Sequence, residues 1–340
     1  MVKRCLLVLA LVAAHCTTTS ARATAGAGAP DADSTKISSR QAAEKFSVWK
    51  ARAARVLIAR GDANSLATAA ALTYVGSSLK TDPAKSAAAA LDLAAQAGEL
   101  APQNAAIGWL HLRLCAETAA CDIRDVATVM RWVDADNGAA WLPTFAAAQK
   151  DKDRIEVDRV LADMSRGSRF DLYFNRVVVL MFDALSRARN ELPRGYAASD
   201  AARLATLSGI AAAELVPAFA PLLEACRESV VSERRELCLK LSKTMQRSDT
   251  IVAQMMGFNI EKRLLAPDGK EARMLADRRH VLEWRLAAAA AFDTSLLPWT
   301  KNSRARARLA LMRAKPREED VCLAILREHK MAVDPPEVHP

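Results

Sequence analysis

Helix-breaking residues recur along this chain at short intervals, and the segments between them have helical periodicity. Val157, Val160, Leu161 and Met164 recur at i, i+3, i+4 and i+7, the spacing of one face of an α-helix. Sustained apolar/polar alternation between hairpin turns, the pattern of strands, is nearly absent. Apolar periodic segments separated by short turns predict antiparallel helix pairs. The breaks fall at Gly61–Asp62, Asp82–Pro83, Pro102, Asp136–Asn137, Gly167, Pro193–Gly195, Pro267–Gly269 and Pro316.

Composition supports the same fold class. Apolar residues make up 51% of the chain but aromatic residues only 5%, and alanine supplies much of the apolar content. Alanine combines the highest helix propensity with little bulk. The sequence therefore predicts an all-α protein of closely packed antiparallel helices.

The N-terminus has the layout of a secretory signal peptide. Lys3 and Arg4 precede an apolar run over residues 5–14, and Ala21-Arg22-Ala23 provides a small-x-small cleavage site. The run is too short to span a bilayer, which needs about 20 residues. We therefore predict cleavage after Ala23, export to the periplasm or outside the cell, and no transmembrane segment. Residues 24–38, which are small, polar and Gly/Pro-bearing, are predicted to form a flexible leader.

A lipid anchor at Cys16 is the less favoured alternative. The acylation site requires a small residue before the cysteine, and His15 is not small. Cleavage after Ala23 lowers the formal net charge from +9 to +6, because Lys3, Arg4 and Arg22 are lost. An excess of this size favours solubility and does not indicate nucleic acid as a partner.

A weak repeat occurs in the first half of the chain. Trp109-Leu110, Trp141-Leu142 and Tyr173-Phe174 follow one another at a spacing of 32 residues. Asn104 and Asn137, in the turns before the first two pairs, lie 33 residues apart. A period in the low thirties is typical of one helix-turn-helix unit of a solenoid. We expect the repeated aromatic side chains to lie in the core.

Over roughly residues 62–190 the chain resembles the tetratricopeptide repeat family, which also places a Pro/Asn turn, an aromatic residue and a leucine at the start of its first helix. The resemblance is degenerate: no unit has both the usual Gly and the usual Tyr, and only the turn at Pro102 keeps its proline. It implies helical hairpins stacked as a solenoid over residues 39–195. A helical bundle with aromatic residues at equal spacing by chance is the alternative.

The C-terminal helical region, residues 196–333, has no clear repeat. It either continues the solenoid or forms a second helical lobe that begins near Gly195, and residues 334–340 are predicted to be a disordered tail. Helices are expected over 199–215, 216–228, 232–246, 249–265, 270–291 and 302–329, the last with a break at Pro316.

Five cysteines remain after the signal, and export favours their pairing. Cys115 and Cys121 flank a short turn, with Asp122 as the expected N-cap of the next helix, so a disulfide across this hairpin is predicted. Cys226 and Cys238 cannot bond on one continuous helix, where about 18 Å would separate them. A turn near Val230–Ser232 would allow this second pair to form.

One basic run stands out near the C-terminus. The bland interpretation is the outer face of a packed helix, and the sharper one is a patch that binds anions or a membrane surface. The run contains seven basic residues and no acidic one: Lys301, Arg304, Arg306, Arg308, Arg313, Lys315 and Arg317.

No catalytic, cofactor or metal-binding motif is recognisable. The four histidines that remain after the signal do not have the spacing of metal ligands, and no phosphate-binding glycine loop or nucleophile elbow is present. We therefore expect an exported, non-catalytic helical-repeat protein that binds another protein or a peptide. The alternatives are an enzyme on an all-helical scaffold, with a site that the sequence does not identify, and a peripheral binder of anionic surfaces through residues 301–317.

Overall fold

The computed structural model describes residues 32–74, 82–118, 121–193, 196, 199–214, 216–227, 231–294 and 301–336, and confirms the all-α fold class. The predicted signal peptide and its cleavage site lie outside these residues. No helix in the described ranges combines the length and the apolar character needed to cross a membrane. The helices are α2 (Ala32–Arg60), α3 (Ala63–Tyr74), α4 (Pro83–Leu100), α5 (Ala105–Ala116), α6 (Ile123–Val133), the 3₁₀ helix η1 (Gly138–Trp141), α7 (Leu142–Lys150), α8 (Arg154–Arg166), α9 (Phe174–Arg187), α10 (Asp200–Glu214), α11 (Ala220–Ala225), α12 (Ser232–Met245), α13 (Ile251–Leu264), α14 (Lys270–Thr294), α15 (Lys301–Ala314) and α16 (Glu318–Glu328).

Short polar side chains set where several helices begin. Asn104 accepts hydrogen bonds from the amides of Ala106 and Ile107, at 3.1 and 3.4 Å, and so caps α5. Asp122 caps α6 as predicted, through the amide of Arg124 at 2.8 Å. Such caps satisfy amides that have no partner within the helix.

The helices expected in the second half are present with bounds shifted by a few residues. The last one is divided at Pro316 into α15 and α16, because proline cannot continue a helix. The flexible leader predicted over residues 24–38 extends too far, because residues 32–38 already belong to α2. Pro30 is the last Gly or Pro before Gly61, so nothing in the sequence interrupts the helix after that point.

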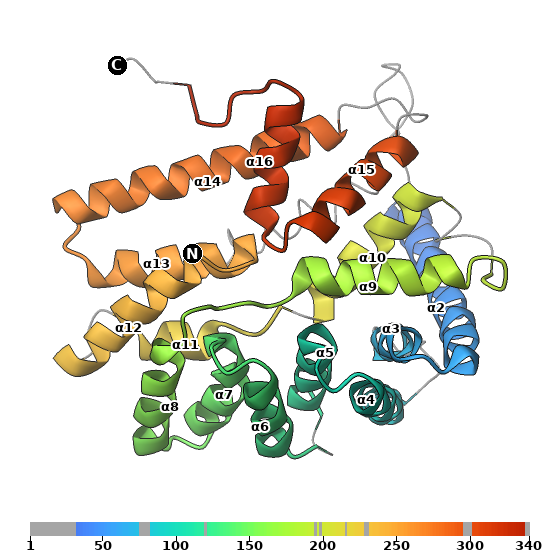
Figure 1. The fold of residues 1–340 in the computed structure, drawn as a ribbon, viewed down its shortest axis with the longest axis horizontal. Helices are drawn as coiled ribbons and strands as arrows, with labels where there is room; N and C mark the ends of the chain where they lie inside the picture. The colour runs from blue at the N-terminus through green and yellow to red at the C-terminus, as the bar shows by residue number, and fades with distance from the viewer. Residues whose placement is uncertain are drawn as a thin grey trace.

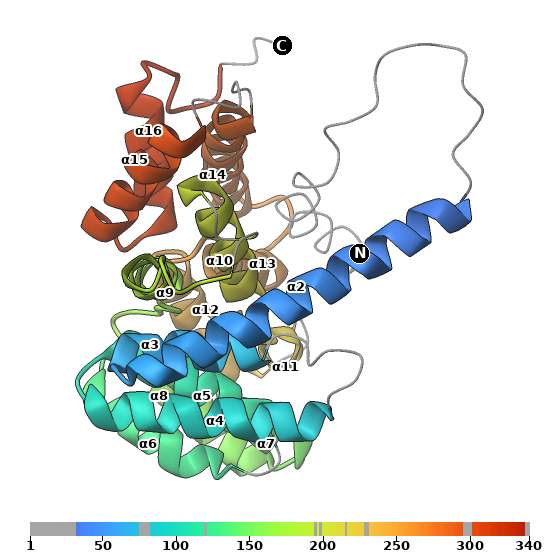
Figure 2. The ribbon, with the colours of Figure 1, turned by 90° about the vertical axis from the view of Figure 1, so that its right-hand side faces the viewer.

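Helices α3 to α8 form a row in which sequence neighbours pack together (Figure 1). Within the row, α3 also contacts α5, and α5 contacts α7, so alternate helices form an inner layer. Eight consecutive residues of α3, from Ser65 to Leu72, are buried. A helix buried all round lies between two layers of other elements. Figure 2 shows α2 lying diagonally across this row, with its first turns extending beyond the other helices.

The row does not continue into α9. This helix crosses back and packs against α3 and α5, and α10 and α15 pack against it in turn (Figure 1). Helix α8 instead contacts α12, far along the chain. The inner layer of the row is therefore covered by the chain itself.

One apolar cluster joins both halves of the chain. It extends from Trp49 in α2 to Ile325 in α16 and includes the buried Trp109 and Tyr173 of the predicted repeat. Trp141, the third repeat aromatic, packs against it with partial exposure. A second, smaller cluster lies between α13, α14 and α16. The first cluster crosses the boundary near residue 195, so the C-terminal region shares part of its core with the first half, while the second cluster belongs to the C-terminal region alone.

The position of α9 depends on a carboxylate in the turn between α12 and α13. Asp249 is 4% exposed and accepts hydrogen bonds from the amides of Leu172 and Tyr173, each at 2.7 Å. At the same junction the amide of Glu318 donates to the Asp249 carbonyl at 2.8 Å. The Glu318 carboxylate in turn accepts from the amide of Ile251 at 2.8 Å. Three connecting segments are thereby joined by hydrogen bonds.

Tyr173 is fixed from a second side as well. Its hydroxyl donates to Asp134, and Asn137 donates to the same hydroxyl oxygen at 3.2 Å. Asn137 also holds the linker itself, because its Nδ2 donates to the carbonyl of Asp171 and its Oδ1 accepts from the Asp171 amide, both at 2.9 Å. Tyr173 has φ of 58°, a left-handed conformation that costs energy in a non-glycine residue. The contacts on both sides hold it there.

The predicted disulfide between Cys115 and Cys121 is formed, and so is the second pair, Cys226 and Cys238, which the sequence left open. Cys115 and Cys121 have their Cα atoms 5.3 Å apart across the α5–α6 turn. Cys226 and Cys238 have theirs 5.7 Å apart, because they do not lie on one continuous helix: Cys226 follows α11 and Cys238 lies in α12. Val230, in the turn expected there, lies outside the described residues. Cys322 takes part in neither disulfide and lies buried in α16.

We predict that Asp249→Ala lowers the free energy of unfolding by about 3 kcal/mol, because two buried amides lose their acceptor. Asp249→Asn keeps one acceptor oxygen and is expected to cost less. Urea unfolding followed by circular dichroism measures both. Equal stability of Asp249→Ala and the wild type would contradict the structural role given to this side chain.

For the disulfides, loop entropy predicts a loss of about 3 kcal/mol for Cys226→Ala with Cys238→Ala, and about 2 kcal/mol for Cys115→Ala with Cys121→Ala. The larger loss belongs to the pair that closes the longer loop, with a sequence separation of 12 against 6. Guanidinium unfolding of the two double variants provides the comparison. The reverse order would show that loop closure does not govern these bonds.

Candidate functional site

A cleft of about 590 Å³ lies between α12, α13, α14 and α16, above the smaller apolar cluster. Phe258 and Leu282, which are 6% and 4% exposed, form its apolar floor together with Val281. Two glutamines and several charged side chains surround this floor. The full lining is Lys243, Gln246, Arg247, Gln254, Phe258, Arg278, Val281, Leu282, Arg285, Glu319 and Asp334.

Close packing of α12 on α13 builds the first wall of the cleft. A Cβ atom on Gly257 would lie 2.7 Å from the carbonyl oxygen of Ser242, so only glycine fits at this contact. Gln254 is 1% exposed and donates to the Ser248 carbonyl at 2.9 Å. Gln246 contacts the carboxylate of Glu261 through its Nε2. The Oε1 of Gln246 is buried and has no hydrogen-bond partner among the described residues.

Helix α14 contributes one stripe of residues to the cleft. Arg278, Val281, Leu282 and Arg285 recur at i, i+3, i+4 and i+7, with the two arginines at the ends and the two apolar residues between them. From the sequence, Val281 and Leu282 lie within the helix expected over 270–291 and carry no sign of a site. The two arginines on either side of this apolar pair are the one indication of a site that the sequence offers. The other walls of the cleft come from helices α12, α13 and α16, and the sequence does not show that these lie beside α14.

The positive charges of the cleft are unequally paired. Arg285 is neutralised by Glu319 and Asp334, at 2.8 and 2.9 Å. Arg278 lies 3.8 Å from Glu261, and its side chain is 55% exposed. Lys243 and Arg247 are exposed, and neither lies within ion-pair distance of a carboxylate among the described residues. The cleft therefore retains an excess of positive charge.

The C-terminal segment reaches this site. Arg285 donates from Nε to the Val333 carbonyl at 3.0 Å as well as to Asp334, and Trp284 donates to the Ala332 carbonyl at 3.4 Å. Arg285 therefore holds Asp334, the first residue of the segment 334–340 that the sequence predicts to be a disordered tail. Residues 337–340 lie outside the described part of the chain.

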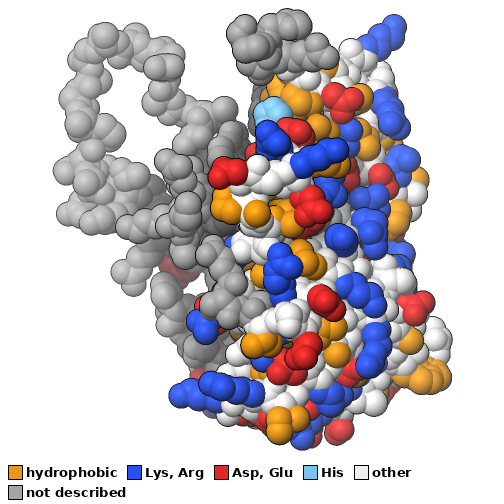
Figure 3. Space-filling model, turned by 90° about the vertical axis from the view of Figure 1, so that its left-hand side faces the viewer, with side chains coloured by type: hydrophobic (Ala, Val, Ile, Leu, Met, Phe, Trp, Pro, Cys, Tyr) orange, Lys and Arg blue, Asp and Glu red, His pale blue; other side chains and the backbone are white. Residues whose placement is uncertain are grey.

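Basic side chains are also frequent on one side of the molecule as a whole. Figure 3 shows the side where α8, α12, α13 and the start of α14 lie, and Lys and Arg side chains form a nearly continuous column along its right-hand margin. Acidic and apolar side chains are interspersed elsewhere on this face. Such a distribution attracts anionic ligands over distances of about a Debye length.

The predicted basic run lies on α15 and in the turn after it, and much of its charge is used within the fold. Arg306 pairs with Asp200 of α10 at 2.6 Å, and Arg313 pairs with Asp183 of α9. The other members lie among neighbouring helices in different ways. Arg317 forms an ion pair with Glu319 at 3.1 Å, and Arg308 interacts electrostatically with Glu318. The guanidinium of Arg304 lies 3.9 Å from the centre of the Phe292 ring. The backbone carbonyl of Lys315 accepts a hydrogen bond from Asn175 at 3.4 Å, and Lys301 is the first residue of α15.

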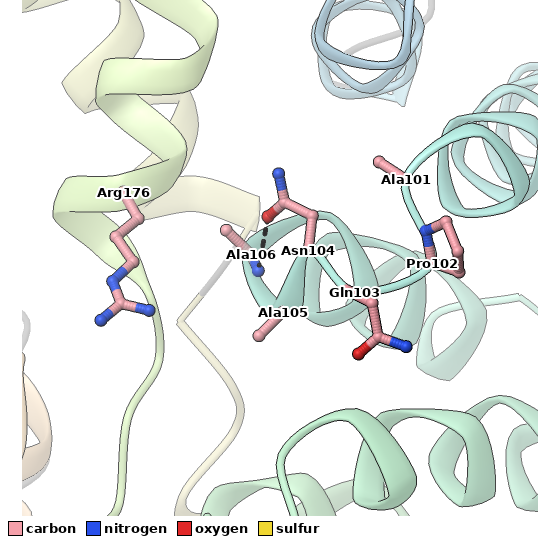
Figure 4. Close-up of a pocket in the computed structure, with 7 residues that line it drawn as sticks. All are labelled: Ala101, Pro102, Gln103, Asn104, Ala105, Ala106 and Arg176. Carbon is pink, nitrogen blue, oxygen red and sulfur yellow. Dashed lines mark hydrogen bonds between the residues drawn. The ribbon is translucent and has the colours of Figure 1, made fainter.

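A second hollow, of about 550 Å³, is wide and shallow (Figure 4). It lies between Arg176 of α9 and the turn Ala101–Ala106 that opens α5. The Asn104 side chain already caps the α5 amides, as the dashed line to Ala106 shows. The helix terminus is therefore satisfied by its own residue, and among the residues that the structure describes Arg176 is the one charged side chain that lines the hollow.

The junction at Asp249 holds carboxyl groups with perturbed titration. Burial raises the pKa of Asp249 well above its ordinary value, and the nearby Asp171 and Glu318 raise it further. Desolvation also raises the pKa of Glu318, although the amide of Ile251 and the charge of Arg308 oppose the shift. Both carboxylates accept backbone hydrogen bonds and neither lines the cleft, so they serve the fold. Within the described ranges, no three His, Cys, Asp or Glu side chains are grouped to hold a metal ion.

Comparisons with known proteins identify no relative: no family model, curated protein or solved structure matches this chain.

We predict that stability contributed by Asp249 is lost as pH rises. Its folded-state pKa is raised, so the folded protein binds this proton more tightly than the unfolded chain does. That contribution is fully present below the unfolded pKa of about 4 and is lost as pH rises through the higher folded value. Urea unfolding between pH 4 and pH 7 should therefore show a smaller decline for Asp249→Asn than for the wild type. Parallel pH curves would contradict the assignment.

Proposed function

We propose that this protein is an exported, non-catalytic helical scaffold that binds a protein or peptide partner in the cleft between α12, α13, α14 and α16. The observation that carries the proposal is the cleft itself, in which an apolar floor is surrounded by hydrogen-bonding and charged side chains. Apolar anchor sites within a polar rim are typical of ligand clefts and of the energetic centres of interfaces.

The position of α9 favours this cleft over the face that a tetratricopeptide-like solenoid would use. Helices α9 and α10 pack on α3 and α5, so the inner layer of the hairpin row is occupied. A ligand on that face would have to displace Val177, Val178 and Met181, each at most 1% exposed. A ligand in the cleft exposes no such buried apolar area, so binding there costs less free energy.

The lining also fits a peptide chain. The buried Gln246 Oε1 is an acceptor without a donor among the described residues, and a buried acceptor of this kind costs about 1–3 kcal/mol. A peptide ligand brings backbone N–H groups that can supply the donor after a rotation of the Gln246 side chain. The alternative of an anionic surface bound through residues 301–317 is less favoured, because Arg306, Arg313 and Arg317 form ion pairs within the fold.

The test is a selection of random displayed peptides on the purified protein and on two variants of α14. Val281→Glu places a charge on the cleft floor, and Met274→Glu makes the same kind of change at an exposed position outside the cleft. Peptides selected on the wild type should bind Val281→Glu about tenfold more weakly or worse and should bind Met274→Glu unchanged.

Thermal unfolding of both variants controls for folding. Lys243→Trp, which blocks the cleft from its exposed rim and leaves the core intact, provides a second test of the same surface. Selected peptides that bind all four proteins equally, or a selection that enriches none, would refute the proposed function.

A further inference from the structure

We infer that the ligand of this cleft is an acidic peptide segment. The inference rests on the proposed function above and adds the chemical class of the ligand.

The first reason is the charge that the fold leaves uncompensated. Lys243 lies in the last turn of α12 and Arg247 one residue beyond its C-cap Gln246, and both line the cleft. Arg278 faces the same cleft from α14, with its nearest carboxylate, that of Glu261, 3.8 Å away. These three cations surround the floor formed by Phe258 and Val281. A segment that alternates carboxylates with apolar side chains complements both features.

The second reason is that α14 already holds a non-helical segment with an acidic side chain. Residues 332–336 have no helical structure, and Arg285 donates hydrogen bonds to the Val333 carbonyl and the Asp334 carboxylate within them. A guanidinium that bonds a main-chain carbonyl and an acidic side chain together can recognise an acidic peptide segment outside a helix. The chain's own tail thus shows, at one edge of the cleft, the recognition that we infer for the partner.

Asp334 then has a consequence for affinity. It is exposed and occupies one face of Arg285, while Glu319 occupies another. An incoming carboxylate competes with Asp334 for this guanidinium. Removal of the Asp334 charge should therefore tighten the binding of an acidic peptide.

The experiment measures fluorescence anisotropy of a labelled eight-residue peptide of alternating glutamate and leucine, beside its glutamine counterpart. The full chain, with both disulfides formed, should bind the glutamate peptide at least about tenfold more tightly, and added salt should reduce the difference. Lys243→Glu and Arg278→Glu should each weaken binding by about tenfold. Their matched controls, Lys240→Glu and Arg273→Glu, change exposed residues of the same two helices outside the cleft and should have no such effect.

Asp334→Asn should tighten binding of the glutamate peptide about threefold. Glu328→Gln, which removes the same charge from an exposed residue outside the cleft, should leave it unchanged and so separates the local effect from net charge. Thermal unfolding of every variant identifies any loss that comes from misfolding.

Four results would overturn the inference. Equal affinity for the two peptides, or cleft-dependent peptides from the random selection without enrichment of Asp and Glu, would refute the acidic class and leave the peptide cleft intact. A third outcome is that the wild type binds neither peptide but binds vesicles of anionic lipid, and that Lys243→Glu and Arg278→Glu lose this vesicle binding. That outcome would assign the basic residues of the cleft to a membrane-binding surface instead. A random selection that enriches nothing at the cleft would refute the proposed function as well.

Discussion

The arrangement of this protein depends on the two hydrogen bonds that the carboxylate of Asp249 accepts from backbone amides. Leu172 and Tyr173 lie 77 and 76 residues away in sequence, and their hydrogen bonds tie the linker before α9 to the turn before α13. Glu318 adds the turn before α16 to the same junction. Because the linker is held there, α9 cannot follow α8 in the hairpin row, and α12 becomes the neighbour of α8 instead.

The same junction positions the candidate site. Three of the helices that line the cleft have one end close to this junction. Helix α12 ends four residues before Asp249, α13 begins two residues after it, and α16 begins at Glu318. Burying carboxyl groups is costly, and the raised pKa values of Asp249 and Glu318 reflect that cost. Hydrogen bonds from backbone amides offset it, as they do at helix caps. The protein thus uses the buried Asp249 and the partly buried Glu318 to fix connections, while Lys243 and Arg247 of the cleft remain exposed to a ligand.

Prediction from the sequence succeeded where the governing interactions are local. The cap at Asp122, the break at Pro316 and the Cys115–Cys121 disulfide follow from residue type and short spacing. The bounds of the leader were less accurate, and the sequence does not show that Asp334 is held by Arg285, a residue 49 positions away. The α14 stripe was present in the sequence, but its meaning required the helices that face it.

The sequence by itself determined an all-helical chain, the ends of many of its helices and the covalent links between neighbours, because i to i+4 hydrogen bonds, caps and short loops act within a few residues. Only the tertiary structure decided that α9 covers the inner layer and that α12, α13, α14 and α16 enclose a cleft. The physical reason is that apolar helix faces pack with many partners at similar gain. The choice among those partners rested on a few buried polar contacts, such as Asp249 with Leu172, that no periodicity encodes.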